Sequence, residues 1–408
     1  MSPIANRFVT PTLCMLLALL LCWQQQALGN DLLALLPQLP YVLLLISALM
    51  ALLSNRSREL ALSLCVLFSY WLIRTHLQAP LDSQPASQIF TLLAFAVPII
   101  GISLIFLPEQ GLTHPQGIAT FTGIPVLLLA LSQLLIINPE LFAQTSMALV
   151  NEPLWFTRLS ASSALTTVIT LGIASLMIVR RQQSIESSVL GCIAMLFVTL
   201  GWIQLNNISA ALFTGMGLLL TINITSGLLH IGFYDELTQI GNRRALIEAA
   251  KTAGNQYTLA MVDADHFKKI NDRFGHDLGD QALKVIASCM LKTGCGGKAY
   301  RYGGEEFCLL FKGKTRDQVA DCLEELRKAI ANYDMVIRDK KQRPKEQGIG
   351  EKKRGASKRH SNLRLTVSVG VADSTSGGSF EHLVKLADRA LYKAKAGGRN
   401  RLEFAQAI

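Results

Sequence analysis

Charged residues are scarce in the first half of this chain, and no lysine precedes Lys251. Through Gly232 the acidic and basic residues are equal in number, so the whole net charge of +10 lies in residues 233–408. A neutral, charge-poor half joined to a basic, polar half indicates a membrane domain followed by a cytosolic domain. We place the boundary between residues 1–232 and 233–408.

The first half consists mostly of long apolar runs. Several approach the roughly 20 residues that a helix needs to cross a bilayer. We expect about eight spans, near residues 10–24, 33–53, 59–75, 88–107, 117–137, 162–180, 188–205 and 208–232. Arginine and lysine collect in cytoplasmic loops, and with the N-terminus inside only Arg74 and Arg158 face outward. The expected result is a multi-pass protein whose C-terminal domain lies in the cytoplasm.

The first apolar run has a second interpretation. Arg7, a short apolar core and the small residues of Ala27-Leu28-Gly29 also resemble a signal peptide with a cleavage site. Cleavage would leave seven spans and would not change the side on which the second half lies. Ionisable residues well inside the apolar runs would point to function, but His230 is the single one there. The sequence therefore names no ligand or stimulus.

The cysteines show no paired short spacing of the kind that marks a zinc site. Four of them lie in apolar runs, and the other four, in the cytosolic half, are Cys289, Cys295, Cys308 and Cys322. We expect reduced structural thiols at these positions.

Two acidic clusters occur in the second half. Gly303-Gly304-Glu305-Glu306 joins two stretches of strand-forming residues, and a Gly-Gly pair in such a place predicts a hairpin turn. Asp263-Ala264-Asp265 follows the apolar run Tyr257–Val262. Carboxylates at a strand end beside a hairpin tip can hold Mg²⁺ through their oxygen atoms. The two clusters together predict metal-assisted phosphoryl chemistry.

Four segments of the second half occur in an order typical of one enzyme family. They are Asp235 to Arg244, Asp263 to Asp280, the GGEEF sequence from Gly303 to Phe307, and Ala387 to Asn400. These segments resemble the motifs of GGDEF-domain diguanylate cyclases. The resemblance implies an α+β cyclase fold related to polymerase palm domains, the condensation of two GTP molecules into cyclic di-GMP, a homodimer, and the bacterial inner membrane as location.

The residue pattern of the second half alternates between helices and strands. It predicts helices over residues 243–253, 277–292, 317–332 and 380–395. It predicts strands over 257–262, 363–372 and 402–404, and a hairpin over 299–311. The expected fold class is thus a multi-pass helical membrane domain followed by an α+β domain.

The resemblance implies a metal site at the two acidic clusters. Mg²⁺, with Mn²⁺ as the alternative ion, would be held by Asp263, the backbone carbonyl of Ala264 and Glu305, with Glu306 assisting. Glu305 is also the candidate for accepting the proton of the attacking hydroxyl, although a bound metal lowers its basicity. Asp265 is interpreted as a helix cap.

The resemblance also implies which residues bind GTP. Lys268 would stabilise the charge on the transferred phosphate, since lysine is a compact charge on a flexible stem. Lys395 and Arg399 resemble ligands of the β- and γ-phosphates.

The guanine base would be bound by Asn271, His276 and Asp280. An aspartate at position 280 favours guanine over adenine, because its carboxylate accepts from the N–H groups of guanine. Gly275 and Gly279 would let the backbone turn closely around the base.

One site of the family is missing. Product-inhibited members carry Arg-x-x-Asp, separated by five residues from the glycine pair, and this chain has Gly294-Cys295-Gly296-Gly297 at those positions. Without the charged pair, we expect no inhibitory site and weak inhibition by the product.

A basic segment, residues 338–362, interrupts the second half. It holds most of the excess positive charge of the chain. A solvated loop is the simplest interpretation, and contact with anionic lipid headgroups or with RNA are the alternatives. No aromatic residue interrupts the segment, so no nucleic-acid partner is expected.

The sequence as a whole predicts a membrane-anchored diguanylate cyclase that is regulated through its membrane domain by an unknown stimulus or sensor partner. A catalytically silent receptor for GTP or cyclic di-GMP is the alternative. A third hypothesis is a transporter or receptor that uses the cyclase as its output.

Overall fold

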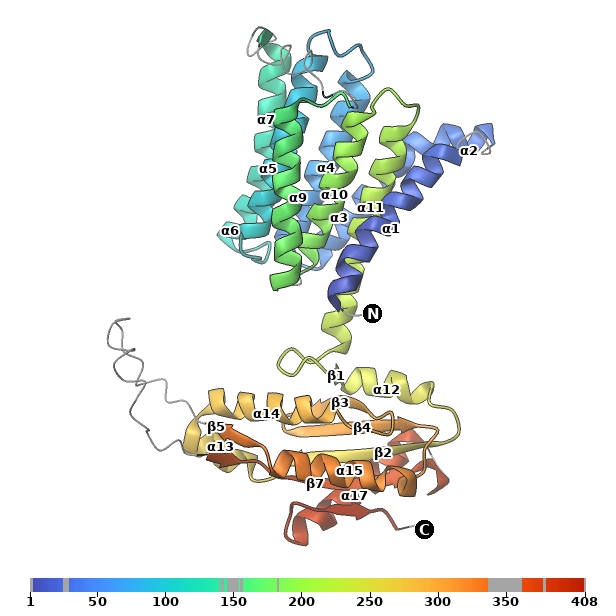
Figure 1. Ribbon diagram of the computed structural model, residues 1–408, viewed down its shortest axis with the longest axis vertical. Coiled ribbons are helices and arrows are strands. Elements are labelled where there is room, and N and C mark those ends of the chain that lie inside the picture. The colour runs from blue at the N-terminus through green and yellow to red at the C-terminus, as the bar shows by residue number, and fades with distance from the viewer. Residues whose placement is uncertain are drawn as a thin grey trace, which may run out of the picture. The chain divides into compact units, whose positions relative to one another are not determined.

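The computed structural model of the protein, shown in Figure 1, describes residues 3–24, 29–138, 140, 143–144, 154, 157–181, 183–336, 362–376 and 379–406. The basic segment at 338–362 and the cleavage site expected near Ala27 lie almost entirely outside these residues. Contacts along the chain divide it into two compact units, Met1–Leu228 and Leu229–Ile408. Each unit is described by itself.

The first unit is built from helices. Their bounds are α1 (Pro3–Trp23), α2 (Asn30–Leu35), α3 (Leu39–Leu53), α4 (Ser57–His76), α5 (Ala86–Phe106), α6 (Pro115–Ile118), α7 (Ile124–Ile137), α9 (Ala161–Arg181), α10 (Ser184–Gly201) and α11 (Ile208–Phe233). A π-helical turn, Ala119–Gly123, joins α6 to α7. The chain crosses from the first unit to the second within α11.

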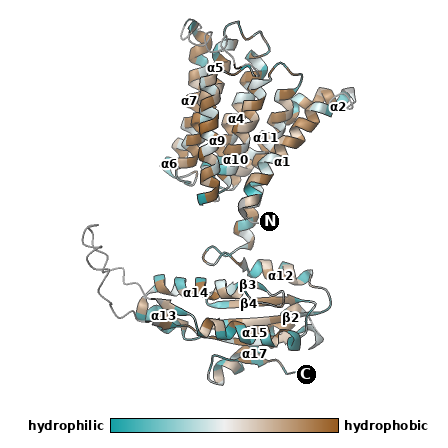
Figure 2. Ribbon diagram, viewed as in Figure 1, coloured by the Kyte–Doolittle hydropathy of each residue, from teal (hydrophilic) through white to brown (hydrophobic). Residues whose placement is uncertain are grey.

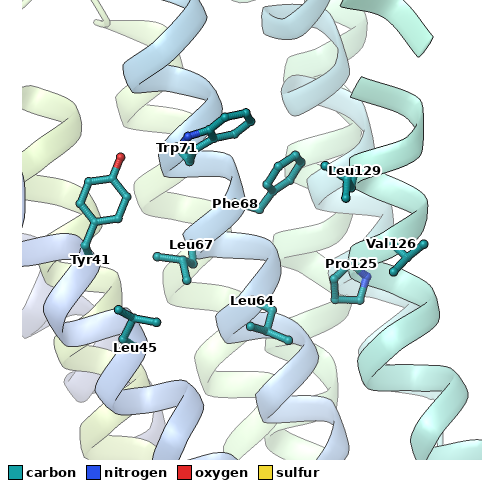
Figure 3. Close-up of a pocket in the computed structure, with 9 residues that line it drawn as sticks. All are labelled: Tyr41, Leu45, Leu64, Leu67, Phe68, Trp71, Pro125, Val126 and Leu129. Atoms are coloured by element: carbon teal, nitrogen blue, oxygen red, sulfur yellow. The ribbon is translucent and has the colours of Figure 1, made fainter. Parts of the chain in front are cut away.

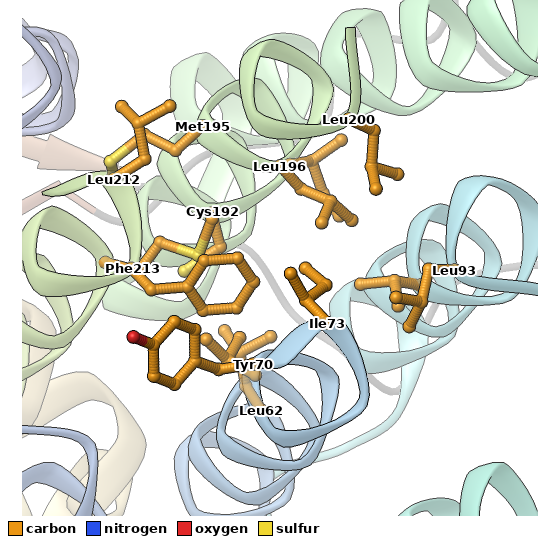
Figure 4. Close-up of a cluster of buried hydrophobic side chains, with 14 of the residues drawn as sticks. Leu62, Tyr70, Ile73, Leu93, Cys192, Met195, Leu196, Leu200, Leu212 and Phe213 are labelled. Carbon is orange, nitrogen blue, oxygen red and sulfur yellow. The ribbon is translucent and has the colours of Figure 1, made fainter. Parts of the chain in front are cut away.

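Apolar side chains fill the centre of this bundle (Figure 4). Tyr70 of α4 packs against Phe213 of α11, with ring centroids 5.1 Å apart, and apolar side chains of α10 belong to the same buried cluster. The outer faces of the helices are apolar as well (Figure 2), including Leu17, Leu45 and Val168, which are about half exposed or more. Helices that are apolar all round suit a lipid environment.

Seven helices of the described residues are long and apolar enough to cross a membrane. They correspond to seven of the eight expected spans, and α4 corresponds to the eighth, near residues 59–75. The helix α4 is absent from the seven, and it carries Arg58, Glu59 and Arg74.

A buried polar network that could not be predicted from the sequence links helices and connecting segments at one end of the bundle. Arg58 is 5% exposed, and its guanidinium donates to Glu109 at 3.0 Å and to Gln183 at 2.9 Å. Ser184 donates to the buried Glu59 at 2.9 Å. Helices α4 and α10 both begin with Ser-x-Glu, so Glu59 and Glu186 lie in the first turns of these two helices, at the same end of the bundle. Buried charges are stable only when paired or hydrogen-bonded.

An apolar pocket of about 440 Å³ lies between α3, α4 and α7 (Figure 3). It is lined by Tyr41, Leu45, Leu64, Leu67, Phe68, Trp71, Pro125, Val126 and Leu129. The lining carries no charged group, and none of its residues belongs to the motifs of the second unit.

The second unit is an α+β domain. Its helices are α12 (Arg243–Lys251), α13 (Phe267–Phe274), α14 (His276–Met290), α15 (Arg316–Ala331) and α17 (Phe380–Ala396). Its main sheet has the order β1-β3-β4-β2-β7-β8, made of β1 (Gly241–Asn242), β2 (Tyr257–Ala264), β3 (Lys298–Gly303), β4 (Glu306–Lys312), β7 (Val367–Asp373) and β8 (Leu402–Phe404). A second sheet pairs β5 (Asp334–Val336) with β6 (Asn362–Arg364).

Alternate residues of β2 supply two cores. Ala260 and Val262 pack with α14 and α15, whereas Leu259 and Met261 pack with α12 and α17. Side chains of a strand point to opposite faces in turn, so helices cover both faces of the central strand (Figure 1). The end of β2 is thereby held in the middle of the sheet.

Most of the predicted elements are confirmed, one is divided in two, and β1, β5 and α13 were not predicted. The single strand expected at 363–372 is two strands, because β6 pairs with β5 and β7 pairs with β2. Helix α13 was not predicted as a separate element. It spans only eight residues and ends at Gly275, whose φ of +83° breaks the helix before α14.

Gly370 lets α17 approach β7 closely. A Cβ atom added at Gly370 would lie 2.2 Å from the carbonyl oxygen of Ala387 and 2.2 Å from the backbone nitrogen of Leu391. The helix backbone cannot yield as a flexible side chain would.

We expect Gly370→Ala to destabilise the protein by about 1–3 kcal/mol, the usual cost of overpacking. The matched control is Gly294→Ala, where the added Cβ would have Cys322 Sγ at an ordinary 3.5 Å. Thermal unfolding of the full-length variants in detergent measures the difference. Equal midpoints for the two variants would contradict the close approach.

Candidate active site

The acidic residues of the two clusters meet at one end of the main sheet. Asp263 lies near the end of β2, opposite Glu306 of β4 and Ser368 of β7. Antiparallel pairing on both sides sets this register, because the hydrophobic residues of each strand must face the same cores. Segments that are distant in sequence thus place their polar residues together, as the sequence predicted.

The β3–β4 hairpin carries Glu305 at its turn. Of its two glycines, Gly304 has a positive φ of +38°, and β3 ends at Gly303. The backbone N–H of Ala264 donates to the carbonyl of Glu305 at 3.3 Å. This bond ties the turn to the end of β2.

Arg301 fastens the hairpin to the start of the unit. Its NH1 atom donates to both carboxylate oxygens of Asp235, at 2.9 and 3.0 Å, and its NH2 atom donates to the carbonyl of Gly304 at 2.7 Å. Burial opposes the ionisation of Asp235, but hydrogen bonds from Thr238 and Arg301 lower its pKa. The segment that follows α11 is therefore bonded directly to the tip that carries Glu305.

Three carboxyl groups at this end of the sheet, those of Asp263, Glu305 and Glu306, have raised pKa values. Burial raises the pKa of Asp263, and the charge of Asp265 adds to the effect. Burial and the charge of Asp263 raise the pKa of Glu305 and that of Glu306. Carboxylates that lie close together in a partly buried place are stabilised by protonation or by a bound cation.

A lysine from α17 supplies part of the positive charge. Lys395 Nζ lies 2.8 Å from Asp263 Oδ2 and lowers the pKa of Asp263 against the effect of burial. The charge of Arg399 acts on Asp263 in the same direction. Lys395 thus contacts a carboxylate of the site directly, and Arg399 acts on it through its charge.

The donor set fits a divalent cation of the Mg²⁺ type. Within the residues that the structure describes, no three Asp, Glu, His or Cys side chains form a complete metal cage. Mg²⁺ rarely uses such cages and is usually held by one or two carboxylates, waters and the phosphates of a substrate. Asp263, Glu305 and the Ala264 carbonyl at the end of β2 offer oxygen atoms of this kind.

Asn271 packs against Gly279 of α14 and has a buried side-chain oxygen that can accept a hydrogen bond. Its Oδ1 atom is buried and has no partner among the described residues. A Cβ atom added at Gly279 would lie 1.9 Å from that oxygen, so Gly279 makes room for the carboxamide. This differs from the role expected for Gly279 beside the base, whereas Gly275 does form a turn with positive φ.

The other expected substrate residues are open to solvent. Lys268 lies in the first turn of α13, and His276 and Asp280 lie in the first two turns of α14; all three are exposed. They flank Asn271 on the two helices that meet at Gly275.

Asp265 does not cap a helix. The residue before α13 is His266, with a φ of +56° and no capping bond from its side chain. The Asp265 carboxylate instead accepts hydrogen bonds from Thr366, Ser368 and the backbone of Asn400. The interpretation as a cap is wrong, because its partners come from segments more than a hundred residues away.

Two cysteines expected to be reduced are bonded to each other. Cys295, in the turn after α14, forms a disulfide with Cys322 of α15, and their Cα atoms are 6.4 Å apart. The pairing spans 27 residues and depends on how α15 packs, so the spacing of cysteines in the sequence did not reveal it. Cys295 lies within Gly294 to Gly297, the segment that lacks the charged residues of the inhibitory site.

Comparisons with known proteins agree with the motifs. Residues 232–350 match the family model described as diguanylate cyclase, GGDEF domain. The chain is 37% identical over 174 residues to the diguanylate cyclase VdcA of Vibrio cholerae, and 32% identical over 184 residues to the diguanylate cyclase DgcM of Escherichia coli K12. The matches cover 41% and 42% of this chain, and 46% and 38% of those relatives.

A solved structure is also similar: the GGDEF domain of DgcB from Caulobacter crescentus in complex with c-di-GMP. It is 32% identical, covers 42% of this chain and 95% of that chain, and gives a TM-score of 0.36. The GGDEF domain of this chain is assigned from the family model, which matches residues 232–350. The chain spans less than half the length of the two curated relatives named above.

We expect Glu305→Gln to leave the metal-free protein as stable as the original or to stabilise it. The pKa of Glu305 is raised on folding, so its ionised form disfavours the folded state, and this penalty is absent below its unfolded-state pKa and grows as the pH rises through its folded-state pKa. The amide removes that penalty at neutral pH.

Thermal unfolding of the full-length protein in EDTA, and again with Mg²⁺ and GTP, measures the effect. The added stability from Mg²⁺ and GTP should be lost in Glu305→Gln. Glu325→Gln, on the exposed face of α15, is the matched control and should keep it. A large loss of stability in EDTA for Glu305→Gln would show that the residue is structural.

Proposed function

We propose that this protein is a membrane-embedded diguanylate cyclase, which condenses two GTP molecules into cyclic di-GMP and two pyrophosphates. The observation that carries the proposal is the meeting of Asp263, Glu305 and Glu306 with Lys395 at one end of the sheet. The motifs and the matched family model support the same reaction.

Each half of the reaction forms one phosphodiester. The 3′-hydroxyl oxygen of one GTP attacks the α-phosphorus of the other, and the bond from that phosphorus to the β-phosphate oxygen breaks. The hydroxyl proton goes to a base, for which Glu305 is the candidate, since burial raises its pKa toward the working pH. Lys268 stabilises the charge on the transferred phosphate.

Asp263, the Ala264 carbonyl and Glu305, with Glu306, would hold the divalent ion. When bound, the ion would neutralise negative charge on the phosphates. Lys395 pairs with Asp263 in the structure. With the ion neutralising Asp263 in the complex with GTP, Lys395 would be able to turn to the β- and γ-phosphates beside Arg399. Lys395 would thus pair with Asp263 before the nucleotide binds and with its phosphates afterwards.

Asn271 and Asp280 select guanine. The buried Oδ1 atom of Asn271, unpartnered within the described part of the chain, is an acceptor for an N–H of the base. The exposed Asp280 carboxylate is a second acceptor, and His276 lies nearby. A base that lacks N–H groups in these places would leave a buried acceptor unsatisfied, which costs roughly 1–3 kcal/mol.

Two chains act together in this proposal. One domain supplies one GTP site, and the product contains two equivalent phosphodiesters, so two sites face each other about a two-fold axis. The seven long apolar helices before the domain anchor each chain in the bacterial inner membrane, with the domain in the cytoplasm where GTP is present. Residues 1–232 are the anchoring and regulatory domain.

We expect Asp263→Asn and Glu305→Gln each to reduce cyclic di-GMP synthesis at least 1,000-fold, since each removes a metal ligand and nearly preserves the shape. Full-length variants in membranes are given GTP and Mg²⁺, and the nucleotide products are identified. Glu325→Gln should keep the original rate. No product from the unchanged protein, together with intact GTP binding, would favour the catalytically silent receptor.

The end of α11 is tied to the GGDEF domain. Asn242 donates to the carbonyl of Gly232 at 3.0 Å, and the guanidinium of Arg244 lies 5.4 Å from the ring centroid of Phe233. A rotation of α11 would therefore be transmitted to the GGDEF domain directly, with no flexible linker between them. The ion pair of Asp235 with Arg301 would transmit it further, to the β3–β4 hairpin.

Insertion of residues after Gly232 tests this coupling. Each inserted residue rotates a continuing helix by about 100°, so two residues should change the rate strongly and four should restore most of it. Synthesis is measured at equal expression in membranes. Equal rates for insertions of one to four residues would show that the membrane domain is only an anchor.

A further inference from the structure

The carboxylate of Asp265 lies where three distant segments meet. It follows the end of β2, accepts from Thr366 Oγ1 at 2.8 Å and from Ser368 Oγ at 2.7 Å beside and within β7, and accepts from the backbone N–H of Asn400 at 3.0 Å. The backbone N–H of Asp265 also donates to the carbonyl of Thr366 at 2.9 Å. Asp265 is 6% exposed, so these neutral donors are what make its burial tolerable.

The turn after α17 needs such an external bond. Arg399 and Asn400 have φ values of +62° and +47°, a conformation that residues with a side chain adopt at a cost. The N–H of Arg399 bonds back to Ala394 of the helix, whereas the N–H of Asn400 bonds to Asp265. Without the carboxylate, the second of these two left-handed residues loses the acceptor of its backbone N–H.

The same turn carries the cations of the active site. Lys395 precedes it at the end of α17 and pairs with Asp263, and Arg399 is part of it. We propose that Asp265 is a positioning residue, which sets Lys395 and Arg399 for the terminal phosphates of GTP by holding the backbone of Asn400. This inference rests on the proposed function and adds to it a residue that does not touch the nucleotide.

Asp265→Asn is the direct test. The amide keeps the shape but removes the negative charge and one of the two acceptor oxygens. An NH₂ group in place of Oδ2 would face the Thr366 hydroxyl and the Asn400 N–H, and one in place of Oδ1 would face the Ser368 hydroxyl. Binding of a GTP analogue that cannot transfer its α-phosphate should weaken at least tenfold in the full-length protein with Mg²⁺. Binding of GMP, which lacks the β- and γ-phosphates, should change less than twofold.

Kinetics give a second readout. We expect the KM for GTP to rise by a larger factor than kcat falls, since the variant loses phosphate positioning and keeps Glu305 and Lys268. A general loss of structure would weaken GTP and GMP by the same factor, and that result would overturn the inference. Unchanged binding of both nucleotides would overturn it too.

Asp373 offers a matched control at the other end of β7. It is 3% exposed and accepts from the backbone N–H of Arg316 at 3.0 Å and from the hydroxyl of Thr375. Asp373→Asn should cost comparable thermal stability and leave the ratio of GTP to GMP affinity unchanged. A selective loss of GTP affinity in this control would contradict a role specific to Asp265.

Two further variants separate the possible failures. Thr366→Val keeps the Asp265 charge and removes one donor, so a selective loss of GTP affinity of about threefold is expected even where Asp265→Asn does not fold. Arg399→Ala tests the proposed function itself. If Arg399→Ala spares GTP affinity, the assignment of the phosphate ligands is wrong; if it weakens GTP and both other variants do not, only the role of Asp265 is wrong.

Discussion

The active end of the GGDEF domain depends on one constraint, the place of β2 between β4 and β7. Both pairings are antiparallel, and both faces of β2 are covered by helices. The strand therefore cannot shift by one residue without turning its apolar side chains out of both cores. That rigidity holds Asp263 next to the hairpin although burial raises its pKa more than Lys395 lowers it. The folding energy of the cores keeps together groups that would otherwise repel one another.

Much of this could be predicted from the sequence because the signals are local. Apolar alternation, the glycine pair at 303–304 and the acidic residues after an apolar run fixed the strand, the turn and the place where they meet. The long apolar runs likewise predicted the helices of the first unit, with α4 the least apolar of them at its ends. Such signals extend over a few residues, so they can be interpreted without knowledge of the tertiary structure.

The features that were missed depend on residues far apart in the chain. Asp265 looked like a cap because its three donors follow about a hundred residues later. Cys295 and Cys322 meet because α15 packs beside the turn after α14. In the helical unit, Arg58 lies in the first turn of α4, whereas Glu109 and Gln183 lie in two different connections between helices. Neither periodicity nor spacing reports such contacts, although the Ser-x-Glu starts of α4 and α10 were visible.

The ion pair between Lys395 and Asp263 has a consequence for the order of binding. Because Lys395 pairs with Asp263, a divalent ion held by Asp263 would require the lysine to leave. Under the proposed function, the triphosphate would give that lysine a new partner. Ion and nucleotide would then bind more favourably as one complex than either would alone.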